Sequence, residues 1–113
     1  MDPLTTTFIT SAVGLIFLIA GLWQYYYPPK QINTTHGYRT SSSTKSQQRW
    51  DFAQQYSGKL MARYGLFLIL LAIAMLLIDL DELIHILLSI GLVFGFLILL
   101  ILKTEQAIKK RFG

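Results

Sequence analysis

The chain has 113 residues, of which 53% are hydrophobic and only 14% are charged, and its formal net charge is +4. Soluble domains carry about 25% charged residues, so this composition excludes that class and predicts a protein built for lipid. The absence of cysteine excludes disulfides and thiolate metal sites. No nucleic-acid recognition fold is visible, so the basic residues predict a bilayer with anionic headgroups as the partner, and no nucleic acid.

The first apolar block covers residues 8–27 and is long enough to cross a bilayer as a helix. It does not resemble a secretory signal peptide, because only Asp2 precedes it as a charged residue and it ends in aromatic residues instead of a small-residue cleavage site. Trp23 and the tyrosines that follow it are typical of an interfacial aromatic belt. Pro28 and Pro29 then end the helix, since neither has a backbone N–H.

Two more apolar blocks, about 61–78 and 83–102, are separated by a short acidic turn and therefore predict a tight antiparallel helical hairpin. Arg63 lies within the second block, where we expect it to snorkel toward the headgroups or to point into the protein. The fold class predicted for residues 1–113 is an all-α integral membrane protein with three transmembrane helices in a single membrane domain.

Charge predicts the orientation. Nine of the 10 basic residues lie either between the first two spans or in the tail 103–113, and the tenth, Arg63, is at the adjoining start of the second span. Three spans place these two regions on one side. The acidic residues of the other side are Asp2, Asp79, Asp81 and Glu82. By the positive-inside rule, the N-terminus is outside, and both the polar segment 28–60 and the basic tail are cytoplasmic.

The polar segment 28–60 is predicted to be a loop followed by a helix. Gly37 gives the loop backbone freedom, and Thr44 with Gln47 fits a capping box that starts a helix. One face of this helix carries Trp50, Ala53, Ser57 and Leu60. This spacing predicts an amphipathic helix that lies at the membrane interface or packs against the bundle, and that leads through Gly58 into the second span.

The same segment resembles the SdpI-like family of bacterial membrane immunity proteins. The residues that carry the resemblance are Ile32, Asn33, Gly37, Tyr38, Arg39, Thr40, Ser43, Lys45, Trp50, Ala53 and Gly58. Thr44, Ser46 and Gln54 depart from the family pattern, and Gln54 stands where Asn is common. The match is to the C-terminal membrane module of longer proteins. The resemblance implies a non-catalytic protein of toxin immunity or sensing in the bacterial cytoplasmic (inner) membrane, with a peptide toxin or a cytoplasmic protein as partner.

The candidate ligand-binding or partner-binding residues all belong to this pattern. They are Asn33, Gly37, Tyr38, Arg39, Thr40, Ser43, Lys45 and Trp50. Arg39 is the strongest candidate, since its guanidinium can bind a phosphate or carboxylate with two hydrogen bonds. The alternative is that Arg39 ties the loop to helix-end carbonyls or lipid headgroups. Trp50 can stack on a ligand, but a membrane anchor is its more common role. Asp51 is expected to pair with Arg39 or Arg63.

No enzyme or cofactor is predicted, because the sequence has no nucleophile with a base, no metal cluster and no phosphate-binding loop. Glu82 and His85 have the E-x-x-H spacing of di-iron sites, but only one copy is present, so no metal site is expected and the turn is interpreted as solvated. The alternative function is a small oligomeric transporter or channel. The lack of buried acids or bases in the spans argues against this alternative.

Gly91 and Gly95 form a G-x-x-x-G pattern in the third span. Small residues at this spacing let another helix approach closely, so we expect helix packing here, either within the chain or in a homo-oligomer. Gly14 with Thr10 in the first span is the candidate complementary face.

Overall fold

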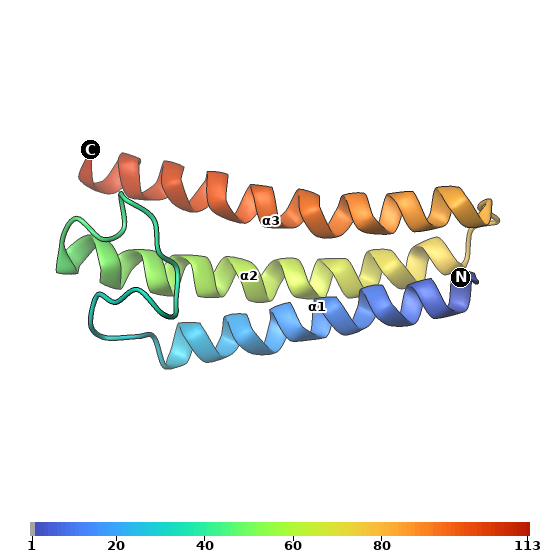
Figure 1. Ribbon diagram of the computed structural model, residues 1–113, viewed down its shortest axis with the longest axis horizontal. Helices are drawn as coiled ribbons and strands as arrows, with labels where there is room; N and C mark the ends of the chain where they lie inside the picture. Colours follow the sequence, from blue (N-terminus) through green and yellow to red (C-terminus); the bar gives the residue numbers. More distant parts are fainter. Residues whose placement is uncertain (1) are drawn as a thin grey trace.

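The computed structural model describes residues 2–113, and that part of the chain is entirely helix, turn and loop. Three long helices, α1 (Pro3–Tyr26), α2 (Gln47–Leu76) and α3 (Glu82–Phe112), run antiparallel to their neighbours in sequence in a bundle 49 Å long (Figure 1). Each helix is long and apolar enough to cross a membrane. The expectation of an all-α protein with three helices of membrane-spanning length is confirmed.

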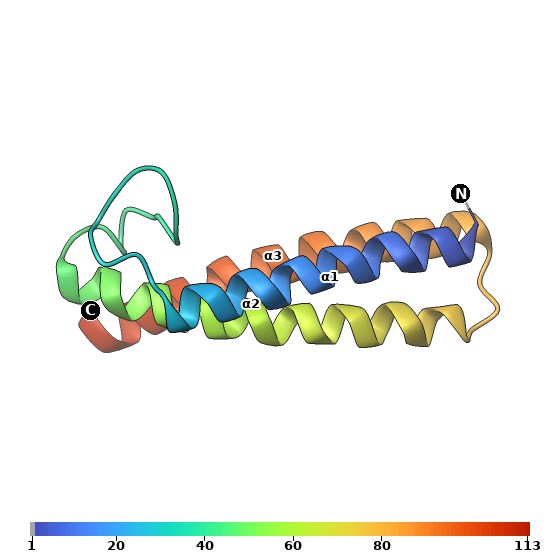
Figure 2. The same cartoon turned by 90° about the horizontal axis from the view of Figure 1, so that it is seen from below.

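The loop between α1 and α2 and the C-terminus lie at one end of the bundle, and the N-terminus and the α2–α3 turn lie at the other end (Figure 2). We call these the loop end and the turn end. The basic residues of the interhelical loop and of the last turns of α3 are therefore at the same end of the molecule, which is the arrangement that the charge pattern requires.

The first helix is capped at both ends by features visible in the sequence. The Asp2 carboxylate accepts a hydrogen bond from the Thr5 N–H at 2.7 Å, and Pro3 occupies the first turn, where its missing N–H has no cost. The helix ends at Tyr26, two residues before Pro28. These observations agree with the predicted end of the first span at the aromatic cluster.

The predicted interfacial helix is not a separate element in residues 2–113. Residues 47–60 form the first half of α2, which continues without a break through Gly58 to Leu76. The start predicted at Thr44 is also wrong: the Thr44 hydroxyl donates to the Thr40 carbonyl at 2.9 Å in a turn, and Ser46 caps α2 by accepting from the Arg49 N–H at 3.2 Å. Trp50, Ala53 and Ser57 do share a buried face, which packs against the bundle.

The basic segment 103–113 is likewise part of a helix, since α3 has 31 residues and ends only at Phe112. Its last turn carries Lys109, Lys110 and Arg111. Cations at this position interact favourably with the negative end of the helix dipole, which helps to explain why the helix continues beyond the apolar run. The segment is therefore a rigid extension of the third span.

Glycines bring α1 and α2 into backbone contact at two levels, seven residues apart in each helix. A Cβ built on Gly65 would lie 2.5 Å from the Gly14 carbonyl oxygen, and one built on Gly21 would lie 2.6 Å from the Gly58 carbonyl oxygen. Such close approach of two helices is possible only without side chains. Gly58 therefore does not break α2, because it is the site where α1 packs against it.

The same contacts fix how far α2 extends past α1. A Cβ on Gly58 would lie 2.8 Å from the Tyr25 N atom, so Gly58 is level with the last turn of α1. Gln24 of α1 still reaches the Gln54 carbonyl, so about the first eight residues of α2, about 12 Å of helix, project beyond the end of α1 at the loop end.

The third helix packs differently. Leu100 of α3 is buried against Leu60 and Tyr64 of α2, and the ring of Phe96 lies 5.0 Å from that of Tyr64. A Cβ added to Gly91 or Gly95 would meet nothing within 4 Å, so the G-x-x-x-G pattern makes no helix contact within the chain. The predicted pairing of Gly14 with this face is also wrong, because Gly14 faces Gly65.

Candidate functional site in the loop between α1 and α2

The loop between α1 and α2, residues 27–46, is folded against the helices by three sets of hydrogen bonds. It stands to one side of the bundle at the loop end (Figure 2). The first anchor is Trp50 of α2, whose side chain is fully buried and whose indole N–H donates to the Pro29 carbonyl at 2.7 Å. This bond fixes the beginning of the loop immediately after the two prolines.

The second anchor is Gln54, one turn further along α2 and also fully buried. Its amide oxygen accepts from the Tyr38 N–H at 2.7 Å, and its amide nitrogen donates to the Tyr38 carbonyl at 2.7 Å. One side chain thus satisfies both backbone groups of a loop residue, as a neighbouring β-strand would. From α1, Gln24 donates to the Gln54 carbonyl at 3.1 Å and to the Ser57 hydroxyl at 2.7 Å.

Gly37 is required next to this bridge. Its φ is +92°, a region that favours glycine, and an added Cβ would lie 2.6 Å from the Gln54 side-chain oxygen and 2.8 Å from Pro29 Cγ. The glycine of the family pattern therefore has a conformational and a steric reason.

The third anchor is Glu105 of α3, which lies beyond the apolar run that ends at Leu102. Its carboxylate accepts hydrogen bonds from the hydroxyls of Tyr38 at 2.6 Å, Ser42 at 2.6 Å and Thr40 at 2.9 Å. Hydrogen bonds to an ionised acceptor are the stronger kind. The carboxylate thus ties three loop residues to the end of the third helix.

The electrostatics of this anchor follow from the same contacts. Burial acts to raise the pKa of the Glu105 carboxyl, but the hydrogen bonds from Ser42, Tyr38 and Thr40 outweigh it and hold the pKa below its ordinary value. Burial, followed by the hydrogen bond to Glu105 and its charge, raises the pKa of the Tyr38 phenol above its usual range. Glu105 is therefore ionised and Tyr38 is protonated across the physiological pH range.

Short-range bonds set the shape of the loop itself. The Asn33 side-chain oxygen accepts from the N–H groups of Thr35 at 3.0 Å and His36 at 2.9 Å. The buried Ser43 hydroxyl accepts from the Thr40 N–H at 2.9 Å and donates to the Thr40 carbonyl at 3.0 Å. Side chains of this kind commonly replace backbone partners in turns.

The predicted site residues thus divide into two groups. Six of them anchor or shape the loop, namely Asn33, Gly37, Tyr38, Thr40, Ser43 and Trp50. The buried Trp50 side chain presents no surface to a ligand or to the membrane. Lys45 and Arg39 are exposed.

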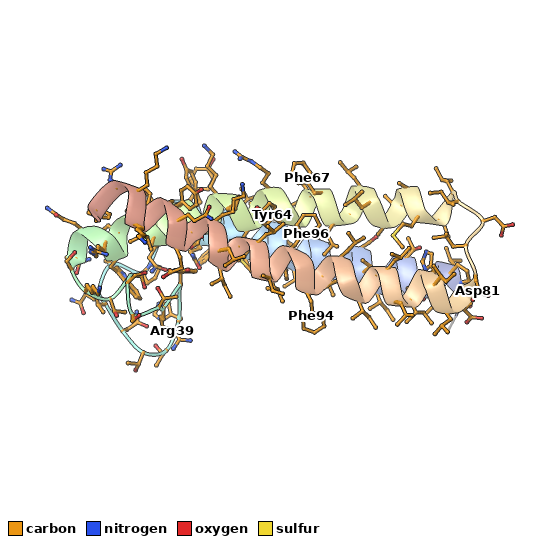
Figure 3. All side chains as sticks on the ribbon, turned by 90° about the horizontal axis from the view of Figure 1, so that it is seen from above. Arg39, Tyr64, Phe67, Asp81, Phe94 and Phe96 are labelled. Carbon is orange, nitrogen blue, oxygen red and sulfur yellow. The ribbon has the colours of Figure 1, made fainter. Side chains whose placement is uncertain are left out.

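Arg39 lies at the outer edge of the loop (Figure 3), where one guanidinium nitrogen donates to the Thr34 carbonyl. The predicted ion pair of Asp51 with Arg39 or Arg63 is not formed among the described residues. Asp51 instead accepts from the Gln47 amide at 2.8 Å, one helical turn away.

Sequence reasoning did not identify Gln24, Gln54 and Glu105 as anchors. Two signals were available: Gln54 occupies a position where the family pattern has another amide, Asn, and Glu105 is the only acid in the basic segment 103–113. Their partners are 16 and 67 residues away from them in the chain, which hydropathy and local spacing do not reveal.

The turn end carries a buried histidine. The His85 side chain is 1% exposed, and neither ring nitrogen has a hydrogen-bond partner among residues 2–113. The sequence predicted a solvated turn in this region, whereas the His85 side chain is buried. Within the described chain, no group of three or more His, Asp or Glu side chains is placed to hold a metal ion.

Comparison with known proteins decides the family. The sequence model of the SdpI/YfhL protein family matches residues 30–104, which include the whole of α2 and the anchors Trp50 and Gln54, whereas Glu105 lies one residue beyond the match. The chain belongs to the SdpI/YfhL protein family. Together with three helices of spanning length, this identifies a bacterial membrane protein of SdpI type.

The chain is also similar to a Bacillus subtilis (strain 168) protein named YfhL and described as uncharacterized, with 43% identity over 53 residues. The match covers 47% of this chain and 48% of YfhL, so it spans about half the length of that relative. No solved structure matches the chain.

Proposed function

We propose that the protein is a non-catalytic immunity or sensing protein of the bacterial inner membrane, which recognises a peptide toxin or a partner protein through the exposed surface of the loop between α1 and α2. The observation that carries this proposal is the combination of rigidity and exposure. Trp50, Gln54 and Glu105 hold the loop backbone in one shape, whereas Arg39 and Lys45 remain exposed. A loop ordered before binding loses less conformational entropy when a partner docks.

The proposed orientation has the loop and the C-terminus in the cytoplasm and the N-terminus outside, and it rests on the positive-inside rule. The chain has no cysteine, so single cysteines introduced by Lys45→Cys and Asp79→Cys can be labelled selectively in intact cells with a membrane-impermeant maleimide. We expect labelling of the Asp79→Cys protein only. Labelling of the Lys45→Cys protein would place the loop outside and remove a cytoplasmic partner.

The function itself is tested by producing the full chain in sensitive bacteria and exposing them to a secreted bacterial sporulation-delaying toxin, the kind of toxin that the resemblance to SdpI-like immunity proteins implies. We expect protection with the unaltered chain and loss of protection with Arg39→Ala. Arg39→Lys separates two chemistries, because lysine keeps the charge but not the two-bond geometry. Lys59→Ala is the charge-matched control, since Lys59 is exposed on α2 outside the loop. Absence of protection by an unaltered, correctly inserted chain contradicts the immunity role.

The alternative role, a small oligomeric transporter or channel, is separated by flux measurements on proteoliposomes. Protection without flux supports immunity or sensing. Native mass spectrometry of the gently extracted protein reports on the proposed homo-oligomer, because it gives the number of chains in each particle.

A further inference from the structure

We propose that the groove between α2 and α3 at the loop end is a binding site for a phospholipid with an anionic headgroup. The groove has a volume of about 470 Å³. Its main lining residues are Phe52 and Tyr56 of α2 and Lys103, Ala107, Lys110 and Arg111 of α3. We call it the basic groove. It is separate from the loop that carries the proposed function.

The charge of the groove has one sign. Lys103 and Lys110 are seven residues apart on α3 and so lie on the same face of the helix. The Arg111 guanidinium lies 5.0 Å from the centre of the Phe52 ring and 5.7 Å from that of Phe112, so cation–π interactions with both rings hold it in place. No carboxylate among residues 2–113 forms an ion pair with Lys103, Lys110 or Arg111. The one acid nearby on α3, Glu105, is bound to the loop.

The depth of the groove matches that of lipid headgroups. On α3, Lys103 directly follows the apolar run, which ends at Leu102. On α2, Tyr56 lies one helical turn before Leu60, which packs against Leu100 near the end of that run. The bundle is 49 Å long, which exceeds a hydrocarbon core of about 30 Å and matches a bilayer of about 40–45 Å with its headgroups. Lysine and tyrosine side chains at this level commonly extend toward phosphate groups.

The position of the groove favours a lipid over a soluble anion. Figure 3 shows nitrogen-tipped side chains at the loop end on the same side of the bundle as Phe67, whereas Arg39 projects on the opposite side with Phe94. Phe67 is exposed and Tyr64 and Phe96 fill the seam between the helices next to it. An acyl chain can therefore lie along this apolar seam while its headgroup phosphate meets Lys103, Lys110 and Arg111.

The test uses the full chain, delipidated in a neutral detergent, with native mass spectrometry to measure lipid affinity. The probes are phosphatidylglycerol, phosphatidylcholine and inorganic phosphate. Each lysine near an anionic headgroup contributes about 1 kcal/mol, so we expect Lys110→Gln to weaken phosphatidylglycerol binding by about 5-fold and the double change Lys103→Gln with Lys110→Gln by about 30-fold. Phosphatidylcholine binding should change by less than about 2-fold.

Lys109→Gln is the matched control. It removes the same charge one residue away, but adjacent helix positions point in different directions and Lys109 does not line the groove. Equal losses in the Lys109→Gln and Lys110→Gln proteins would show attraction to net charge and would overturn the site. Equal affinity for the two lipids, or displacement of the lipid by inorganic phosphate at similar concentration, would also overturn it. Unchanged melting temperatures without lipid confirm that the variants are folded.

Discussion

The close contact between α1 and α2 gives the sharpest test of the fold. In the Gly65→Ala protein the new methyl group would lie 2.5 Å from the Gly14 carbonyl oxygen, 2.5 Å from the Leu18 N atom and 2.9 Å from Phe17 Cβ. Two of these three neighbours are backbone atoms, which no rotamer change can move aside. The helices must therefore move apart by about 1 Å to restore ordinary contact distances.

The cost can be worked out from this geometry. Inserting a methyl group into a packed contact costs about 1–3 kcal/mol, and the better helix propensity of alanine offsets up to about 1 kcal/mol. We expect a loss of about 1–2 kcal/mol in the free energy of unfolding. The matched control is Gly91→Ala, the same chemical change at a position where a Cβ meets nothing within 4 Å. It should leave stability unchanged or raise it by up to about 1 kcal/mol.

The assay is reversible unfolding of the full chain in mixed micelles of a neutral detergent and dodecyl sulfate, followed by circular dichroism. The comparison of the two alanine variants cancels effects of the detergent. Equal stabilities for Gly65→Ala and Gly91→Ala would refute backbone contact between α1 and α2. A marked destabilisation by Gly91→Ala would show instead that the open face of α3 packs against a second chain.

Three further predictions concern single side chains. Glu105→Gln removes the ionised acceptor of three hydroxyls, so amide hydrogen exchange in residues 38–43 should become about 10-fold faster, whereas Gln106→Ala, an exposed neighbour, should leave it unchanged. The docked loop lowers the pKa of the Glu105 carboxyl below its ordinary 4.5. The stabilisation of the loop by Glu105 is therefore complete well above pH 4.5 and is lost as the pH falls through the lowered pKa. Protection of the loop amides, corrected for intrinsic exchange rates, should be constant between about pH 6 and 8 and decline in acid. Constant protection down to pH 3 would contradict this linkage. His85→Leu replaces a buried ring with two unpartnered nitrogens by an aliphatic side chain, so thermal stability in detergent should rise by about 1 kcal/mol; a clear loss would show that His85 has a polar partner in the membrane.

Hydropathy and charge were sufficient for the three helices of membrane-spanning length and for the shared position of the loop and the C-terminus, but they also predicted a separate interfacial helix that is part of α2. They were not sufficient for helix partners. Gly14, Gly65, Gly91 and Gly95 all lie in apolar segments, but among residues 2–113 only the first two are in a contact between helices. Lipid chains and leucine side chains are equally apolar, so a buried and a lipid-facing glycine have the same sequence environment. The role of Gly58 as a contact with α1 was hidden in the sequence for the same reason.

For the candidate site, too, the sequence predicted some features and missed others. The family pattern directed attention to the loop, and Gly37, Tyr38 and Trp50 are indeed at its structural centre. The pattern did not distinguish residues that shape the loop from those that are exposed on it. That distinction depends on Gln54 and Glu105, whose contacts with Tyr38 are made across the bundle.

The projection of α2 beyond the end of α1 has a consequence for the length of the connection between them. An extended chain advances about 3.3 Å per residue, so about four residues would cover the roughly 12 Å by which α2 projects beyond α1. The connection comprises residues 27–46. Most of it is therefore surplus to closing the bundle, and insertions, deletions or substitutions between its anchors leave the register of the helices unchanged. The exposed surface of the loop can therefore diversify independently of the helical scaffold.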